Sequence, residues 1–308
     1  MTTLAAGLDY VDLKFRGRPQ IIATGILHDV SGVALVDPGP GSTLSALTAE
    51  LERRGISIGD VRAILLTHIH LDHAGATGSL LMRNPAIEVY VHERGARHMI
   101  DPSKLLASAE RLYGDLMESL WGEFLAVPAD RVRTLTGGER IPCSGRELEV
   151  AYTPGHAVHH VSYLDRSSGV AFVGDVAGIR RAPGTYIVPP TPPPDIDVAA
   201  WRKSADQILE WQPQTLFLTH FGPFQDAPEH MRELMDRLGE WVRIARALAA
   251  RQELSDDERC AEFVRQIRID LRRHMSEAEA ENYERAGRFD YSWYGLKRYI
   301  TKLTEPHA

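Results

Sequence analysis

The sequence is poor in cysteine, with only Cys143 and Cys260 in 308 residues. Two cysteines so far apart provide neither a disulfide framework nor a cysteine-rich zinc site, and they fit a reducing compartment. No apolar run reaches about 18 residues, so we expect no membrane span. The N-terminus lacks a basic segment followed by an apolar one, so we expect no signal peptide and a cytoplasmic protein.

Basic tracts and nucleotide-binding loops are also missing. The net charge is −7 and lysine and arginine are not clustered, which argues against a nucleic-acid partner. Neither G-x-x-x-x-G-K-[ST] nor G-x-G-x-x-G occurs, so nucleotide-dependent chemistry has no visible site. The absence of G-x-S-x-G removes the usual signal of a serine hydrolase. The remaining expectation is a globular protein that acts on a small molecule.

Histidine, by contrast, is concentrated in one segment. Residues 67–75 read Thr-His-Ile-His-Leu-Asp-His-Ala-Gly, which places three imidazoles and one carboxylate within six residues. The segment directly follows the apolar run 63–66, which is typical of a buried strand. Imidazole nitrogen and carboxylate oxygen are the ligands that zinc and related divalent ions take in catalytic sites. The pattern therefore predicts a metal site at the end of a strand.

Four other apolar segments also run into a polar residue with ligand chemistry. They are residues 36–37, 152–156, 172–175 and 217–220, which end at Asp37, His156, Asp175 and His220. Side chains at the ends of strands have rigid support and still reach solvent, as a catalytic metal requires. We therefore expect these segments to meet the histidine-rich one.

This ordered set of five motifs resembles the metallo-β-lactamase superfamily of hydrolases over about residues 20–225. The resemblance implies an α/β fold, the αβ/βα four-layer sandwich, in which two mixed sheets lie face to face and helices cover them. It also implies a site with two divalent metal ions. The implied ligands are His68, His70 and His156 for the first ion, Asp72, His73 and His220 for the second, and Asp175 as a bridge. Asp37 and His160 match residues that support such a site from behind.

The chemistry expected of such a pair explains why these residue types are needed. Zinc is our first expectation for the ions, with iron or manganese as alternatives. Two ions can hold a water between them and lower its pKa toward about 7, so hydroxide exists at neutral pH. Asp72 is then the best-placed carboxylate to accept or return a proton. Tyr186 has two interpretations: its hydroxyl assists the oxyanion, as in lactonase-like relatives, or its ring packs on the proline-rich loop 189–194.

Apolar periodicity predicts how the chain is organised. Residues 1–225 are expected to form the catalytic domain, with a helical insertion at about 95–124, and residues 226–308 a helical C-terminal extension. Expected strands are 21–27, 32–36, 63–67, 88–92, 133–135, 148–152, 161–164, 170–173 and 215–218, and expected helices include 43–54, 197–210 and 231–250. Ser255 and Ser276 each begin a capping-box pattern and therefore two further helices.

These observations favour a metal-dependent hydrolase acting on a small acyl substrate. Thioesters, lactones and other carboxylic esters share one tetrahedral transition state, so the ligands alone do not separate them. Phosphodiester hydrolysis is an alternative that the net charge of −7 disfavours. β-Lactamase activity is disfavoured by the missing export signal. A non-catalytic metal-binding scaffold would need closed coordination or a missing ligand. A homodimer is left open.

Overall fold

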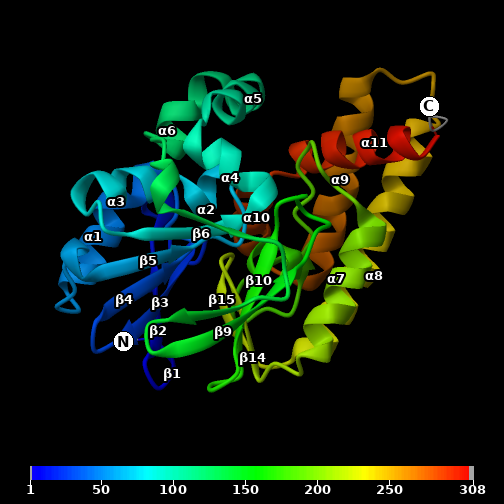
Figure 1. The fold of residues 1–308 in the computed structure, drawn as a ribbon. Coiled ribbons are helices and arrows are strands. Elements are labelled where there is room, and N and C mark those ends of the chain that lie inside the picture. The colour runs from blue at the N-terminus through cyan, green and yellow to red at the C-terminus, as the bar shows by residue number, and fades with distance from the viewer. Residues whose placement is uncertain (1, 305–308) are drawn as a thin grey trace.

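Two β-sheets packed face to face form the centre of the molecule in the computed structural model, which describes residues 2–304 (Figure 1). In sheet order, the first sheet contains β1 (Thr2–Ala5), β2 (Leu8–Asp12), β3 (Ala23–Asp29), β4 (Gly32–Val36), β5 (Val61–Leu65), β6 (Glu88–His92) and β7 (Val132–Leu135). The second contains β15 (Gly222–Phe224), β14 (Thr215–Leu218), β11 (Val170–Phe172), β10 (Val161–Asp165), β9 (Arg146–Tyr152) and β8 (Arg140–Cys143). A short ribbon pairs β12 (Ile179–Arg180) with β13 (Ile187–Val188).

Both sheets are mixed, and their parallel strands determine where the site lies. Strands β4, β5, β6 and β7 run parallel to one another in the first sheet, and β11 runs parallel to β14 in the second. Neighbouring parallel strands end at the same edge of a sheet, and loops at such edges commonly carry functional groups. Four of the five predicted motifs follow β4, β5, β11 and β14, so the topology gathers them.

Side chains alternate along each strand between an inner and an outer core. On β11, Val170 and Phe172 pack in the core between the sheets, whereas Ala171 packs under the outer helices. On β5, Leu65 faces the second sheet and Ile64 faces outward. This period of two is the pleat of a β-strand with both faces covered.

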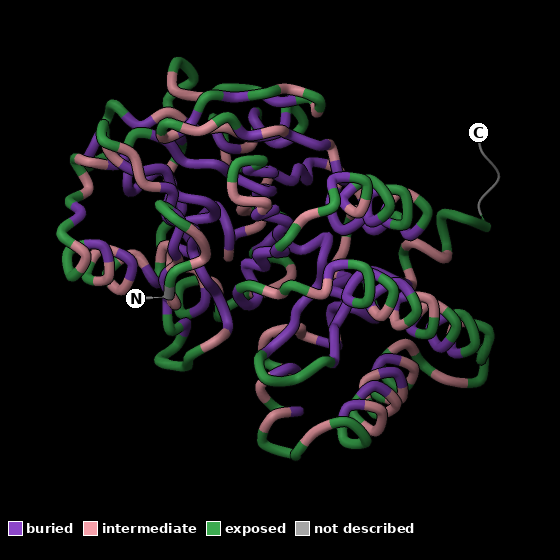
Figure 2. The backbone as a smooth tube through the Cα atoms, turned by 90° about the horizontal axis from the view of Figure 1, so that it is seen from below, coloured by how far each residue is buried: buried purple, intermediate pink, exposed green. Residues whose placement is uncertain are grey.

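Helices cover both outer faces and complete the expected αβ/βα four-layer order (Figure 1). The first sheet carries α1 (Leu44–Glu52), α2 (Leu71–Ala74), α3 (Thr77–Arg83), α4 (Glu93–Ile100), α5 (Ser103–Tyr113) and α6 (Met117–Trp121). The second carries α7 (Val198–Glu210), α8 (Ala227–Ala249), α9 (Asp256–His274), α10 (Glu277–Gly287) and α11 (Phe289–Thr304). Exposed residues recur along the outward turns of these helices and in the connecting loops (Figure 2). Helices α4, α5 and α6 occupy the segment 95–124 that was expected to form a helical insertion.

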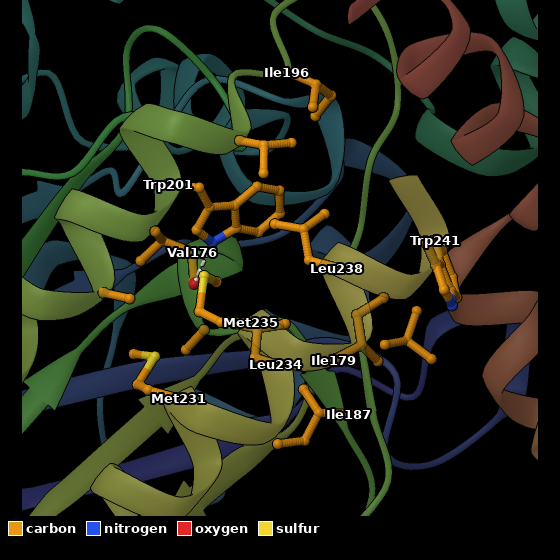
Figure 3. Close-up of a cluster of buried hydrophobic side chains, with 14 of the residues drawn as sticks. Val176, Ile179, Ile187, Ile196, Trp201, Met231, Leu234, Met235, Leu238 and Trp241 are labelled. Carbon is orange, nitrogen blue, oxygen red and sulfur yellow. Dashed lines mark hydrogen bonds between the residues drawn. The ribbon is translucent and has the colours of Figure 1, made fainter. Parts of the chain in front are cut away.

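The core under α7 and α8 also holds part of the site in place. Trp201 on α7 packs among Ile196, Val176 and Leu238, which lies on α8 (Figure 3). The indole Nε1 of Trp201 donates a hydrogen bond to the carbonyl oxygen of Val176 at 2.7 Å. Because Val176 directly follows Asp175, this contact anchors the turn that presents Asp175 to the site.

The two predicted helix starts in the C-terminal part differ in detail. At Ser255 a complete capping box forms with Glu258. At Ser276 the hydroxyl accepts a hydrogen bond from the Glu279 backbone, but the Glu279 carboxylate accepts one from Arg181 instead of returning to the cap. The second box is thus half formed, because a tertiary ion pair competes for its carboxylate. No helix formed by residues 2–304 combines the length and apolar character that a membrane crossing requires.

Candidate metal centre

The histidine-rich segment leaves β5 at the edge where the parallel strands end. His68 and His70 lie in the short link between the strand and α2, and α2 carries Asp72 and His73. The four-residue helix α2 follows the link directly and turns the chain sharply. The side chains of the link and of α2 that carry ligand atoms can therefore point into one space. His73 is completely buried, whereas the Asp72 side chain keeps 24% of its surface exposed.

Three further segments bring the other predicted ligands to this edge. His156 lies in the loop between β9 and β10, Asp175 lies in the 3₁₀ turn Gly174–Ala177 after β11, and His220 follows β14 directly. All three are buried.

The donor atoms form groups in which every atom lies within 4.8 Å of the others. One group contains His68, His70 and His156, a second contains Asp72, His73 and His220, and a third joins His68 and His73 to Asp175. In the first group, Nε2 of His68 and Nε2 of His156 each lie 2.9 Å from Nδ1 of His70. In the second, Nε2 of His220 lies 3.3 Å from a carboxylate oxygen of Asp72.

Asp175 lies between the first two groups. Its Oδ2 is 3.4 Å from Nε2 of His156, while its Oδ1 is 3.2 Å from Nε2 of His73 and 3.5 Å from Nε2 of His220. One carboxylate oxygen thus faces each group. This placement is the one that a bridging ligand would need.

The donor set fits a cation, because it contains buried polar atoms that the protein leaves unpaired. Nε2 of His73 and Oδ1 of Asp175 are both buried and neither makes a hydrogen bond within residues 2–304. A buried polar atom without a partner costs about 1–3 kcal/mol. A divalent ion accepts lone pairs from imidazole nitrogen and carboxylate oxygen and would remove that cost.

The protonation states agree with this fit. Burial holds the pKa of His68 well below its usual value and lowers that of His70 to about 3, so both rings are neutral and can donate lone pairs. Burial disfavours charge on His73 too, but the carboxylates of Asp175, Asp37 and Asp72 outweigh it and raise its pKa. Burial likewise opposes ionisation of Asp72, yet neighbouring His73 and His220 lower its pKa to about 2. Asp72 therefore stays ionised, and a cation would take the place of the protons on the histidines that balance its charge.

The outward-facing ring nitrogens of three histidines are held by acceptors outside the cluster. Nδ1 of His73 contacts Asp37 at 2.9 Å, Nδ1 of His156 contacts the Pro190 carbonyl at 2.8 Å, and Nδ1 of His220 contacts the Ile21 carbonyl at 2.7 Å. Each contact places the proton on Nδ1 and leaves the Nε2 lone pair directed into the cluster. Such supporting bonds fix ring orientation and increase ligand basicity.

Asp37 is the hub of this support. Its carboxylate accepts hydrogen bonds from the backbone N–H of Thr67 at 2.8 Å and from the hydroxyls of Thr67 and Thr219 at 2.7 Å each, besides the His73 contact. Thr67 follows β5 and Thr219 follows β14, so one carboxylate ties together strand ends from both sheets. The structure thus places Asp37 behind the donor groups, where the sequence pattern put it.

A cavity of about 710 Å³ opens onto the cluster. His70, Asp72, His156, Asp175 and His220 lie at its base. Its walls are mostly apolar and come mainly from four parts of the chain: residues 15–22 before β3, the α4–α6 insertion, the loop 190–195 and the α10–α11 junction. The ligand-like atoms therefore face a space that accommodates a small molecule.

Comparison with known proteins identifies the family. A model of the metallo-beta-lactamase superfamily matches residues 18–220, well over half of the chain. The chain belongs to that superfamily. The superfamily match includes every residue that the resemblance implied as a ligand of the two ions, from His68 to His220.

Curated members of the superfamily match the chain over part of their length. The metallo-beta-lactamase fold-containing protein ST1585 of Sulfurisphaera tokodaii is 32% identical over 179 residues, which cover 56% of this chain and 66% of that protein. Thioesterase pkgB of Emericella nidulans is 30% identical over 143 residues, 46% of this chain and 31% of its own. A hydroxyacylglutathione hydrolase of Synechococcus is 30% identical over 152 residues, 49% of this chain and 46% of its own. The chain thus spans about a third to two thirds of these relatives.

Solved structures show the same fold over nearly the whole chain. The metallo-beta-lactamase family protein TTHA1429 of Thermus thermophilus aligns with a TM-score of 0.73 at 21% identity, covering 98% of this chain and 95% of that one. ST1585, solved from Sulfolobus tokodaii, aligns with a TM-score of 0.64 at 23% identity, covering 94% and 98%. The C-terminal helices are therefore included in a known arrangement.

Tyr186 lies away from the superfamily's metal edge, so its expected role on an oxyanion is wrong for this structure. Its hydroxyl donates a hydrogen bond to Asp270 on α9 at 2.7 Å, and the Arg237 guanidinium lies 3.6 Å from the centre of its ring. The ring is buried in the core shared by β13 and the C-terminal helices, and it does not line the cavity. Its partners are distant in sequence, so the local pattern could not indicate them.

His160 supports the cluster from behind, whereas its neighbour His159 lines the cavity. Nδ1 of His160 contacts the Thr153 hydroxyl at 2.9 Å, and its ring stacks at 5.1 Å on that of His68. Gly174 makes this close packing possible, because a Cβ there would lie 2.8 Å from Nε2 of His160, and its φ of 45° also favours glycine.

Sequence reasoning missed the aromatic residues that wall the cavity. Tyr113 and Trp121, from the insertion, and Tyr291, from α11, all line it. The insertion was expected to be helical, without a prediction for its individual aromatic residues. A signal was present, since an aromatic residue at the end of a helix near the site mouth is a candidate wall residue.

Proposed function

We propose that this chain is a dinuclear metal-dependent hydrolase that cleaves a small acyl substrate: a thioester, a lactone or another carboxylic ester. The observation that supports it most is the position of Asp175, which turns one carboxylate oxygen toward each of two donor groups at the base of a cavity. When bound, two divalent ions would supply a water of lowered pKa and an electrophile for a carbonyl oxygen.

The residues of the chain have distinct tasks in this proposal. His68, His70 and His156 would hold one ion, and Asp72, His73 and His220 the other. Asp72 faces the cavity and stays ionised, so it can accept a proton from an attacking water and return it to the leaving group. Zinc suits this nitrogen-rich set, while the carboxylate oxygens of the second group also suit iron or manganese.

The apolar part of the cavity wall favours a compound with an acyl chain. Its lining is mainly apolar, from Phe15 and Ile22 near β3 to Leu105 and Trp121 in the insertion. The relatives named thioesterase and hydroxyacylglutathione hydrolase also favour an ester-type bond over a phosphodiester or a β-lactam.

A hydrolysis panel tests the proposal. Protein reconstituted with Zn²⁺, Fe²⁺ or Mn²⁺ is assayed with a glutathione thioester, the octanoyl thioester of N-acetylcysteamine, short and long acyl lactones, an aryl ester, a phosphodiester and a β-lactam. Turnover of a carboxylic ester or thioester that stops on chelation and returns with the ion supports it. Turnover confined to the phosphodiester or the β-lactam refutes it. The absence of turnover of every substrate by metal-loaded protein also refutes it.

A further inference from the structure

The insertion and the C-terminal helices meet beside the metal edge at a pair of tyrosines. Tyr113 is the last residue of α5, and Tyr291 lies in the first turn of α11. Their ring centroids are 5.2 Å apart and their planes are nearly perpendicular. Trp121 also packs edge-on against Tyr113, with ring centroids 5.0 Å apart. Two aromatic neighbours thus hold the Tyr113 ring in one orientation.

The two phenol groups differ in what they contact. The Tyr291 hydroxyl donates a hydrogen bond to the Leu112 carbonyl at 3.1 Å, which closes the junction between the two helices. The Tyr113 hydroxyl makes no hydrogen bond to any residue in 2–304, and its side chain lines the cavity. A phenol that the protein leaves unpaired in a mostly apolar wall costs free energy unless a ligand or water pairs with it.

The Tyr113 phenol also lies near the acidic end of the cluster. Burial raises its pKa first, and the negative charge of Asp72 raises it further. The hydroxyl therefore keeps its proton at neutral pH and can only donate or accept a hydrogen bond, not act as a base. Tyr113 and Asp72 line the same cavity, so a small molecule bound there can contact both side chains.

We propose that the Tyr113 hydroxyl contacts the substrate and donates a hydrogen bond to the oxygen of the acyl carbonyl. This inference deepens the proposed hydrolase function and rests on it. As water attacks, a C–O bond forms, the carbonyl oxygen gains negative charge, and the bond to the leaving group then breaks. Tyr113 keeps its proton throughout and binds the charged oxygen more strongly than the neutral one, so its contribution appears in kcat.

The kinetic test removes this one hydroxyl. With the octanoyl thioester of N-acetylcysteamine, or the ester that the panel identifies, Tyr113→Phe is expected to lower kcat by about 10- to 100-fold and to change KM by less than about 3-fold. Metal content and thermal unfolding should not change, because the hydroxyl bonds no part of the protein. Tyr186→Phe is the matched control: it removes a hydroxyl that lies outside the cavity, so kcat should stay the same.

A binding test separates this role from the hydrolase function itself. n-Octylphosphonate carries an apolar chain and a tetrahedral anion, and calorimetry should show its Kd about 10-fold higher in Tyr113→Phe than in wild type or Tyr186→Phe. If the panel shows no ester hydrolysis while this difference holds, the proposed function fails and Tyr113 remains a ligand donor. Equal kcat and equal Kd in Tyr113→Phe overturn the role and leave the hydrolase intact. No turnover and no phosphonate binding by wild type overturn both.

Discussion

Replacing Asp37 is the most informative perturbation, because this carboxylate links the strand ends to the metal ligands. In Asp37→Ala, the N–H and hydroxyl of Thr67, the hydroxyl of Thr219 and Nδ1 of His73 all lose their acceptor. All four groups belong to fully or almost fully buried residues, so water does not readily replace the carboxylate.

The expected loss of stability follows from these contacts. Each buried donor left unpaired costs about 1–3 kcal/mol, and breaking a buried ionic network typically costs about 3–5 kcal/mol. Asp37 also has a φ of 50°, a conformation that disfavours alanine by about 1–2 kcal/mol. We expect the free energy of unfolding to fall by at least about 3 kcal/mol. Asp37→Asn tolerates this backbone and keeps the shape, so its cost in stability should be smaller.

Metal affinity should respond differently from stability. In Asp37→Asn, His73 loses the carboxylate that orients its ring, so we expect the metal Kd to rise about 10-fold or more. Urea unfolding measures the first quantity and chelator competition the second. The control is Asp165→Asn, since Asp165 is equally buried but pairs with Arg146, Ser167 and Ser168, far in the sheet from the cluster. That variant should lose stability and keep its metal Kd.

Two results would contradict this role of Asp37. If Asp37→Asn binds metal as tightly as wild type, then the contact to His73 does not hold the ligand in its working orientation. If Asp37→Ala unfolds at the wild-type urea concentration, then the four donors have found other partners, and Asp37 is not the hub of the strand ends.

Other perturbations test the ligands, a buried histidine and the cavity rim. Asp175→Ala should remove metal from at least one site and abolish hydrolysis; turnover with full metal content by elemental analysis would contradict the bridge. Burial lowers the pKa of His230 to about 4, although its bond to the Ala177 carbonyl opposes this. Below pH 6.5 the unfolded histidine takes up a proton that the folded one refuses until about pH 4. As the pH is lowered from 6.5 to about 4, the free energy of unfolding should therefore fall by about 3 kcal/mol in total. Urea unfolding of His230→Gln should show a flatter pH dependence. Arg97 and Lys104 line the cavity and form no ion pair within residues 2–304. Arg97→Gln should therefore raise KM about 3-fold for an acyl substrate with a negative charge but not for a neutral one. The control is Arg111→Gln, on the outside of α5, which should change KM for neither substrate. If the two variants raise KM equally, a role for Arg97 is rejected.

The sequence was sufficient where a pattern is local. The segment 88–92 alternates β-favouring apolar residues with polar ones, the segment 215–218 is mainly apolar, and β6 and β14 have these bounds. The ligand motifs were found for the same reason, since each places its donor directly after a strand. The donors of both groups lie together as the resemblance implied.

The failures concern contacts between distant segments. Tyr186 pairs with Asp270, 84 positions later, and no local feature of the loop encodes that partner. Helix α2 lies within the histidine motif and has no apolar periodicity to announce it. The hairpin of β1 and β2 was also missed, because it is stabilised by pairing with β3 rather than by a strong pattern of its own. Tyr113 was hidden because helical spacing gives a face but not its tertiary neighbour.

The donors come from both halves of the sandwich, and this has a thermodynamic consequence. His68 and His73 follow a strand of the first sheet, whereas Asp175 and His220 follow strands of the second. An ion in either donor group would be held by ligands from both sheets and would cross-link the halves, and no such site would exist in the unfolded chain. Its binding would then add to the free energy of unfolding, by about 2.7 kcal/mol at a free ion concentration 100 times Kd. The lifetime of the folded protein in a cell would thus depend on how much free metal its surroundings contain.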